Sequence, residues 1–311
     1  MAITLYNTGF GTVDTKSLAM LYDKTFDKIK DLNDKALKEG IKFVAERDAV
    51  QESYIEGEVT NELGLPFVSN DTEKIRMLSP MFGHDVTITM VQYRAGIAAT
   101  RRAEKSQKTR MLKRLMTGLP ASADRKVEYL IADLFNSGFT TTTGGDGSFL
   151  YSADHTKFDA SVAAWTNLMT ASDFTTGSYF LMWQNAQNRT SERGFPDPHK
   201  ITELIYPVGK HRVVAEVLGS PKVAENALNN INAFQGDCKA TCYHYLTSTT
   251  AHFARLDYGE NEGFVLVWWD RPDYASISVS DNPEIIWGKR VLLACAAGAI
   301  HARNWIGNAG A

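Results

Sequence analysis

Apolar residues recur at helical spacing in several segments, and the clearest of these is residues 119–138. Its apolar positions fall three and four residues apart, as on the buried face of a helix: Val127, Leu130, Ile131, Leu134 and Phe135. Ser122 is the expected N-cap, and Gly138 is expected to end the helix. The same reasoning predicts helices over residues 172–188, with Ser172 as the cap, and over residues 210–218.

The segment 16–39 also follows a helical pattern, with an apolar stripe opposite a face of alternating lysines and aspartates. Such a helix can pack on its own domain. It can also form an N-terminal arm that packs on a neighbouring subunit. The sequence favours the two interpretations equally.

Alternating β-branched and polar residues predict a strand over residues 86–100, and a short strand is expected over 202–207. Residues 238–300 have mostly strand character, which is best defined at 264–269, 275–279 and 284–287. Periodicity does not distinguish strand from helix over residues 289–305. Residues 45–80 have few large apolar side chains and several turn residues, which predicts an extended hairpin or loop with little core of its own.

Composition narrows the class of protein. The chain has 311 residues, of which 44% are hydrophobic and 22% charged, as in ordinary globular proteins. Its formal net charge of −3 argues against a nucleic-acid clamp or a polybasic membrane anchor. Three cysteines do not suggest a disulfide framework. We expect neither a signal peptide nor a membrane span, because the N-terminus and the apolar runs fit neither.

One segment departs from the overall charge balance. Residues 101–114 contain a single acid, Glu104, among the basic residues Arg101, Arg102, Lys105, Lys108, Arg110, Lys113 and Arg114. A solvated helix face is the simpler interpretation. The alternative is a surface turned towards a polyanion or an acidic partner.

The sequence contains only weak matches to known metal-binding or catalytic motifs. Cys238, Cys242 and His244 form a C-x3-C-x-H pattern, and His252 is the one candidate for a fourth zinc ligand. Small buried cysteines in a strand are the commoner interpretation of this pattern.

Two further motifs also have simpler structural interpretations. Asp154 and His155 are adjacent and would point to opposite faces of an extended chain, so a structural histidine is favoured over a catalytic dyad. The glycines at 144, 145 and 147 precede no helix start, which favours a turn over a phosphate cradle. We therefore assign no catalytic, cofactor-binding or metal-binding residue and expect a protein that is not an enzyme.

Several runs together resemble a known family. Residues 133–139 read DLFNSGF, and after a Gly/Thr loop residues 145–155 read GDGSFLYSADH. This order is similar to the L-F-N-x-x-F … D-G … L-F-S-x-x-H stretch of tailed-bacteriophage major capsid proteins, in the Mu-like major head subunit branch of the Hong Kong 97 fold. Residues 205–207, 215–220, 229–236 and 245–253 resemble later elements of that family, although His252 stands where tryptophan is usual. The resemblance spans about 115–255 and rests on the joint order of packing and turn residues.

The resemblance implies an α+β fold of the Hong Kong 97 type. Residues 1–44 would be an N-terminal arm and 45–85 an extended E-loop. Residues 86–157 and 276–303 would form a peripheral domain, whose long spine helix includes 127–135. Residues 158–275 would form an axial domain, and 304–311 a C-terminal tail.

The implied function is that of a major head protein. It would self-assemble as hexamers and pentamers into an icosahedral shell around a double-stranded DNA phage genome, which it would enclose without sequence-specific binding. Assembly would take place in the host cytoplasm, and the product would be the virion capsid. A separate scaffolding protein or a short N-terminal substitute is implied, with a portal and decoration proteins as further partners and no cofactor or membrane.

Two alternatives remain open. One is a soluble α+β enzyme or encapsulated-cargo protein, and the other is a non-viral nanocompartment shell of the encapsulin type. We assign no covalent cross-link to Lys74, because a lysine in a loop is ordinary.

Overall fold

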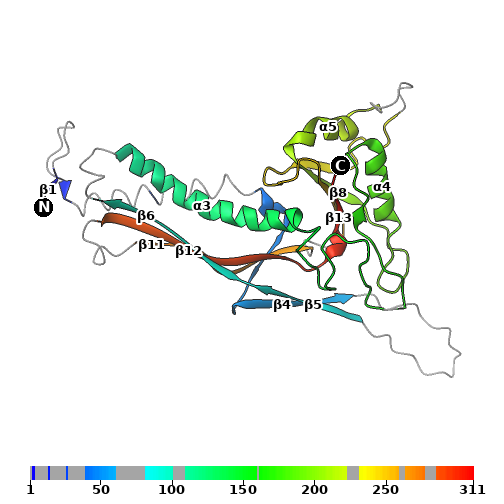
Figure 1. The fold of residues 1–311 in the computed structure, drawn as a ribbon, viewed down its shortest axis with the longest axis horizontal. Helices are drawn as coiled ribbons and strands as arrows, with labels where there is room; N and C mark the ends of the chain where they lie inside the picture. Colours follow the sequence, from blue (N-terminus) through cyan, green and yellow to red (C-terminus); the bar gives the residue numbers. More distant parts are fainter. Residues whose placement is uncertain are drawn as a thin grey trace, which may run out of the picture.

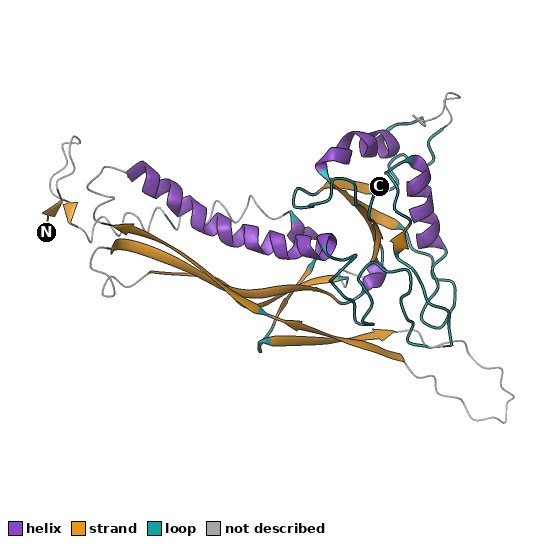
Figure 2. Ribbon diagram, viewed as in Figure 1, coloured by secondary structure: helices purple, strands orange, loops and turns teal. Residues whose placement is uncertain are grey.

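The computed structural model describes residues 2–3, 13–14, 26, 39–60, 81–100, 109–159, 161–222, 231–258, 263–276 and 285–311. These residues form an elongated body with a compact lobe at one end (Figure 1). The body consists of a long helix over a long sheet. The lobe consists of a second sheet with two shorter helices, and a two-stranded hairpin runs below both (Figure 2).

The long helix is α3, which spans Thr109–Asn136. It begins ten residues before the expected start at 119, so the predicted cap at Ser122 is wrong. The Ser122 hydroxyl instead donates a hydrogen bond of 2.7 Å to the carbonyl oxygen of Leu119, a contact that serines make inside helices. The predicted apolar face is confirmed, because Val127, Ile131 and Phe135 are all buried.

The sheet beneath α3 has the strand order β3-β11-β12-β6. Its strands are β3 (Ala45–Asp48), β6 (Val91–Thr100), β11 (Phe264–Ser276) and β12 (Ile285–Ala299). The pair β3–β11 is parallel, and β11–β12 and β12–β6 are antiparallel. Residues 264–268 of β11 are all buried, because Phe264, Leu266 and Trp268 belong to the core shared with α3 and Val265 and Val267 to a second core beside the hairpin.

The hairpin consists of β4 (Ser53–Thr60) and β5 (Met81–Thr89), which pair antiparallel. Of these two strands, only β4 lies within residues 45–80, where the sequence predicted a hairpin or loop, because its partner strand β5 begins beyond that segment. Residues 45–48 join the long sheet, and 61–80 lie outside the described residues. The strand predicted over 86–100 is divided at the buried Met90. The part before it pairs with β4, and the part after it pairs with β12.

The compact lobe contains a five-stranded sheet of order β7-β13-β10-β8-β9. Its strands are β7 (Leu168–Met169), β8 (Ile201–Tyr206), β9 (Lys239–Cys242), β10 (His252–Leu256) and β13 (Trp305–Asn308). Two helices share an apolar core with this sheet, α4 (Thr176–Gln187) and α5 (His211–Gly219). The strand and helix predicted over 202–207 and 210–218 are thereby confirmed.

The predicted cap of α4 is wrong. Thr175, and not Ser172, accepts a hydrogen bond of 3.1 Å from the backbone N–H of Ser178. Ser178 reciprocates through its own hydroxyl, which completes a capping box. The Ser172 N–H instead donates to the side chain of Asn308 on β13.

The strand pairing also differs from the expected division of the chain. Residues 264–275 pair with β12 in the long sheet, although the expected axial domain includes them. The expected C-terminal tail contains β13, which lies between β7 and β10. The ambiguity over residues 289–305 is also resolved, since β12 runs to Ala299 and a short 3-10 turn, Ala302–Asn304, leads into β13.

The N-terminal part is described at few positions. Strands β1 (Ala2–Ile3) and β2 (Val13–Asp14) pair with each other. Within the helix predicted over 16–39, only Phe26 and Glu39 are described, and Phe26 is helical and fully buried. Its ring packs against Tyr274 and Trp287, at centroid distances of 5.5 and 6.3 Å. At this position the segment packs on its own chain.

Residues 101–108 of the basic segment lie outside the described residues.

Candidate functional site

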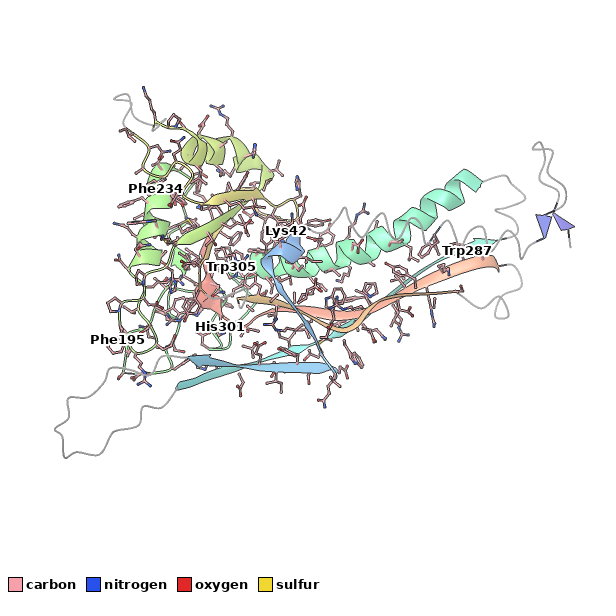
Figure 3. All side chains as sticks on the ribbon, turned by 180° about the vertical axis from the view of Figure 1, so that it is seen from behind. Lys42, Phe195, Phe234, Trp287, His301 and Trp305 are labelled. Atoms are coloured by element: carbon pink, nitrogen blue, oxygen red, sulfur yellow. The ribbon has the colours of Figure 1, made fainter. Side chains whose placement is uncertain are left out.

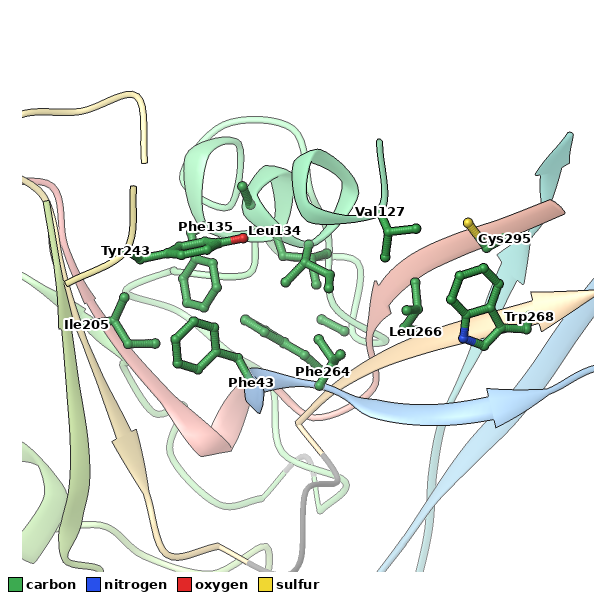
Figure 4. Close-up of a cluster of buried hydrophobic side chains, with 14 of the residues drawn as sticks. Phe43, Val127, Leu134, Phe135, Ile205, Tyr243, Phe264, Leu266, Trp268 and Cys295 are labelled. Carbon is green, nitrogen blue, oxygen red and sulfur yellow. The ribbon is translucent and has the colours of Figure 1, made fainter. Parts of the chain in front are cut away.

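One aromatic cluster joins the body to the lobe, with Phe135 at its centre (Figure 4). The Phe135 ring lies edge-on to Phe253, Trp305 and Phe264, at centroid distances of 5.1, 5.1 and 5.2 Å. It also contacts Phe43 and Tyr243 edge-on. These rings come from α3, β10, β11, β13 and the segments flanking β3 and β9, and such contacts add to the stabilisation from burial. The two sheets therefore share one core.

A buried carboxylate fixes the chain where it enters β3. Glu128 is 1% exposed, and its Oε2 accepts hydrogen bonds from the Gly40 N–H and the Tyr243 hydroxyl, at 2.7 and 3.1 Å. Burial raises the pKa of Glu128, although these hydrogen bonds act in the opposite direction. A Cβ on Gly40 would lie 2.6 Å from both Glu128 Oε2 and Tyr243 Oη, so a larger residue there would displace these two groups.

His155 has a structural environment, as the sequence favoured. Its Nδ1 lies 2.8 Å from Asp146 Oδ2, its Nε2 lies 3.1 Å from Asn167 Oδ1, and its ring stacks on Trp165 at 4.4 Å. Burial raises the pKa of Asp146, but the hydrogen bond and charge of His155 outweigh it and leave that pKa below its usual value. Asp154 is exposed. The glycine-rich segment around Asp146 is closed by a bridge between Thr143 and Phe149, which confirms that it forms a turn.

A buried ion pair continues this polar cluster. Arg303 and Glu192 form an ion pair, and each residue is only 6% exposed. Arg189 is equally buried and donates to the carbonyl oxygen of Arg303. Burial and the charge of Arg303 lower the pKa of Arg189 to about 9. Sequence reasoning missed this group, because tertiary packing brings Arg303 to Arg189 and Glu192, which are distant from it in the sequence.

The four residues considered as zinc ligands occupy different environments. The His244 side chain is 62% exposed and pairs with Glu39 at 3.1 Å. His252 is buried, and burial lowers its pKa to about 4. Burial raises the pKa of Cys238 to about 11 and also raises that of Cys242, so both thiols are protonated at neutral pH. Within the described residues, no three His, Cys, Asp or Glu side chains gather as a metal site would need.

The surface offers contacts for other proteins. The helix α4 carries no charged residue, and its Phe180 and Leu181 are 41% and 52% exposed. On the hairpin, Ile55 is 64% exposed. The long sheet ends in β3 and β6, whose outer edges pair with none of the described strands. Among the helices of the described residues, none combines the length and apolarity that crossing a membrane requires. Exposed apolar side chains and open strand edges favour association with further chains.

Comparison with known proteins gives similarity in structure but not in sequence. No family model and no curated protein matches the chain. A structure of the procapsid of bacteriophage JBD30 is 12% identical with a TM-score of 0.50, and the match covers 94% of this chain and 74% of that one. The capsid of an empty GTA particle is 10% identical with a TM-score of 0.54, covering 88% and 89%. An encapsulin complex from Synechococcus elongatus is 7% identical with a TM-score of 0.51, covering 88% of each chain.

These matches extend over most of the chain, from the long helix and sheet to the compact lobe. They include capsid proteins and an encapsulin alike, at identities too low to distinguish a branch. The expected fold class is confirmed for the overall fold, without assignment to a branch. The chain has a mixed α+β fold of the Hong Kong 97-like capsid type.

Proposed function

We propose that the chain is a structural protein whose copies assemble into a closed shell. The observation that carries this proposal is the similarity to shell-forming proteins over about nine-tenths of the chain. The surface supports it, since apolar side chains remain exposed on α4 and on the hairpin. Weak contacts of this kind become strong when they are repeated around closed rings.

More specifically, we propose a major head protein of a tailed bacteriophage, located in the virion. The sequence resemblance over about 115–255 supports this branch. Hexamers and pentamers would use the same contacts at different angles, and the shell would enclose double-stranded DNA without reading its sequence. A scaffolding protein, a portal and decoration proteins are the expected partners, and assembly would take place in the host cytoplasm.

We infer a corresponding division of labour within the chain. Residues 1–44 would act as the arm, 45–85 as the E-loop, and α3 as the spine helix of the peripheral domain. The compact lobe would be the axial domain. Strand pairing supports counting β11 with the peripheral sheet and β13 with the axial one.

A nanocompartment shell is the second candidate, because the encapsulin match has a similar TM-score. The content of the particle distinguishes the two candidates.

The test is to express the full chain alone and together with its candidate scaffolding protein. Light scattering after size exclusion and negative-stain microscopy would measure the product. We expect closed particles of megadalton mass. Nucleic acid within particles from infected cells would support the phage shell, whereas a co-purifying enzyme would support the nanocompartment. A stable monomer or dimer under all conditions would contradict both.

A further inference from the structure

The hairpin β4–β5 packs on the rest of the chain, and β5 contributes three of these contacts. The innermost contact is between Ile88 and Gly298 of β12. Ile88 is 6% exposed, and a Cβ on Gly298 would lie 2.5 Å from its Cδ1. Ile88 shares its apolar cluster with Val265 and Val267 of β11. The root of the hairpin therefore packs directly on the long sheet.

The second contact involves the turn at Gly145. A Cβ on Gly145 would lie 2.9 Å from Val86 Cγ2 and 3.1 Å from His84 Cβ. The residue after it is Asp146, which the buried His155 holds at 2.8 Å. The turn that touches the hairpin is thus itself fixed to the interior of the compact lobe.

The third contact is the tightest. A Cβ on Gly83 would lie 2.0 Å from Cζ of Phe158, and the His84 ring meets the Phe158 ring edge-on at 5.6 Å. Phe158 is well anchored, because its N–H donates a hydrogen bond of 2.8 Å to Glu192, the partner of Arg303. The buried Lys157 beside it donates to Thr190 Oγ1 at 2.6 Å.

This third contact coincides with an irregularity in the hairpin. Between the pairs Gly57–Asp85 and Val59–Phe82, β5 advances three residues while β4 advances two. The extra residue is a β-bulge at Gly83 and His84. Bulges bend a strand and increase its twist, and so change the direction of whatever follows.

The opposite face of the hairpin is open. Ile55 and its cross-strand partner Thr87 are exposed, as is Asp85. The hairpin thus has a root packed on its own chain, a bend at a defined position, and a free face. Figure 3 shows the side of the compact lobe that approaches the hairpin, where Phe195 is labelled.

We propose that the bulge at Gly83 and His84, together with the Phe158 ring, is a joint that sets the direction of the outer hairpin. The contacts at Gly145 and Gly298 hold the inner hairpin in place. The ring packs against the bend at Gly83 and His84, and the bend fixes where the outer hairpin points before a second copy binds it. Binding by a second copy rests on the proposed function, whereas the joint itself does not.

The experiment measures hydrogen exchange of the unassembled full chain by mass spectrometry. Phe158→Ala removes the ring from the bend, and Gly83→Ala places a methyl group against it. Both variants should speed exchange about tenfold in the outer hairpin, residues 57–60 and 81–84, through local opening. Exchange at residues 86–89 and in α3 should stay as in the wild type.

Matched controls separate the joint from general destabilisation. Phe180→Ala changes a phenylalanine of α4 that is 41% exposed, and Gly219→Ala adds a methyl group where no atom of another segment lies within 4 Å. Neither should alter exchange in the hairpin. Unchanged exchange in both joint variants would overturn the proposal. So would an increase that extends equally to α3 and β11. If Phe158→Ala does not fold, Phe158→Leu, which shortens the ring contact, replaces it.

Assembly is a separate readout. Variants with a loosened joint should give particles with a broader range of diameters than the wild type. If the wild type forms no particles but the exchange result holds, the proposed function fails and the joint remains.

Discussion

The backbone N–H of Gly40 donates a hydrogen bond of 2.7 Å to Glu128, a residue 88 positions further along the chain. The bond places the segment that leads into β3 against the C-terminal third of α3. The other carboxylate oxygen of Glu128, Oε1, has no hydrogen-bond partner within the described part of the chain. A buried carboxyl group with one unpaired oxygen favours the protonated form, which agrees with its raised pKa.

This environment predicts a pH dependence of stability. Because the folded state raises the pKa of Glu128, it binds the proton more tightly than the unfolded chain does. The free energy of unfolding should therefore fall as pH rises from the ordinary value near 4.5 through the raised one. Glu128→Gln should flatten this fall, as measured by denaturant titrations over the pH range. The exposed Glu52→Gln is the control, and an unchanged slope in Glu128→Gln would contradict the prediction.

The pair of Asp146 and His155 predicts the opposite dependence of stability on pH. The pKa of Asp146 is lowered in the folded state, so its contribution is present above the ordinary value of 3.8 and is lost as pH falls through the lowered one. Asp146→Asn should cost about 1–3 kcal/mol at pH 7, as for a hydrogen bond to a charged group. The difference from the wild type should disappear in strong acid.

Asp154→Asn is the matched control for that experiment. Asp154 is exposed and adjacent to His155 in sequence, and its substitution should change stability by less than about 0.5 kcal/mol. Equal effects of the two substitutions would contradict the role assigned to Asp146.

Phe135 should be among the most sensitive positions of the core. It is fully buried and meets rings from both sheets, so Phe135→Ala should cost about 3–5 kcal/mol. Because the core is shared, fluorescence and circular dichroism should report one unfolding transition at a lower denaturant concentration. Phe149→Ala, at an exposed site, should leave the midpoint nearly unchanged. Two separate transitions in the wild type would argue against a common core.

The free face of the hairpin predicts an effect on assembly without an effect on folding. Ile55 is 64% exposed, so Ile55→Asp should leave the melting temperature of the unassembled chain unchanged. If a neighbouring copy covers this face, the buried charge should lower the particle yield at least about tenfold. Ile231→Asp adds the same charge at an 88% exposed position of the compact lobe. Equal losses in the two variants would attribute the effect to charge and not to the hairpin.

Elements with regular apolar spacing could be predicted from the sequence alone. The buried face of α3, the strand β8 and the helix α5 follow from apolar spacing, because amphipathic periodicity reports directly which side is covered. The boundaries were harder to predict. Ser122 and Ser172 are good capping residues, but α3 begins well before Ser122, and the capping box at Thr175 determines where α4 begins.

The polar groups of the interior were not predictable from single residues. His155 is partnered by Asp146, and not by the adjacent Asp154, because the intervening turn folds Asp146 back onto the ring. Arg303 lies just before β13, and its contact with Glu192 depends on the place of β13 in the second sheet. The pairing of β3 with β11 joins residues more than two hundred positions apart, and no local signal specifies it.

Cryo-electron microscopy of the purified full chain tests the central claim most directly. The account predicts closed shells in which each subunit places α3 and the long sheet in the wall, with the hairpin lying on an adjacent copy. A particle-free preparation of folded monomers, with the hairpin face exposed to solvent at every concentration and in the presence of the candidate scaffolding protein, would contradict it.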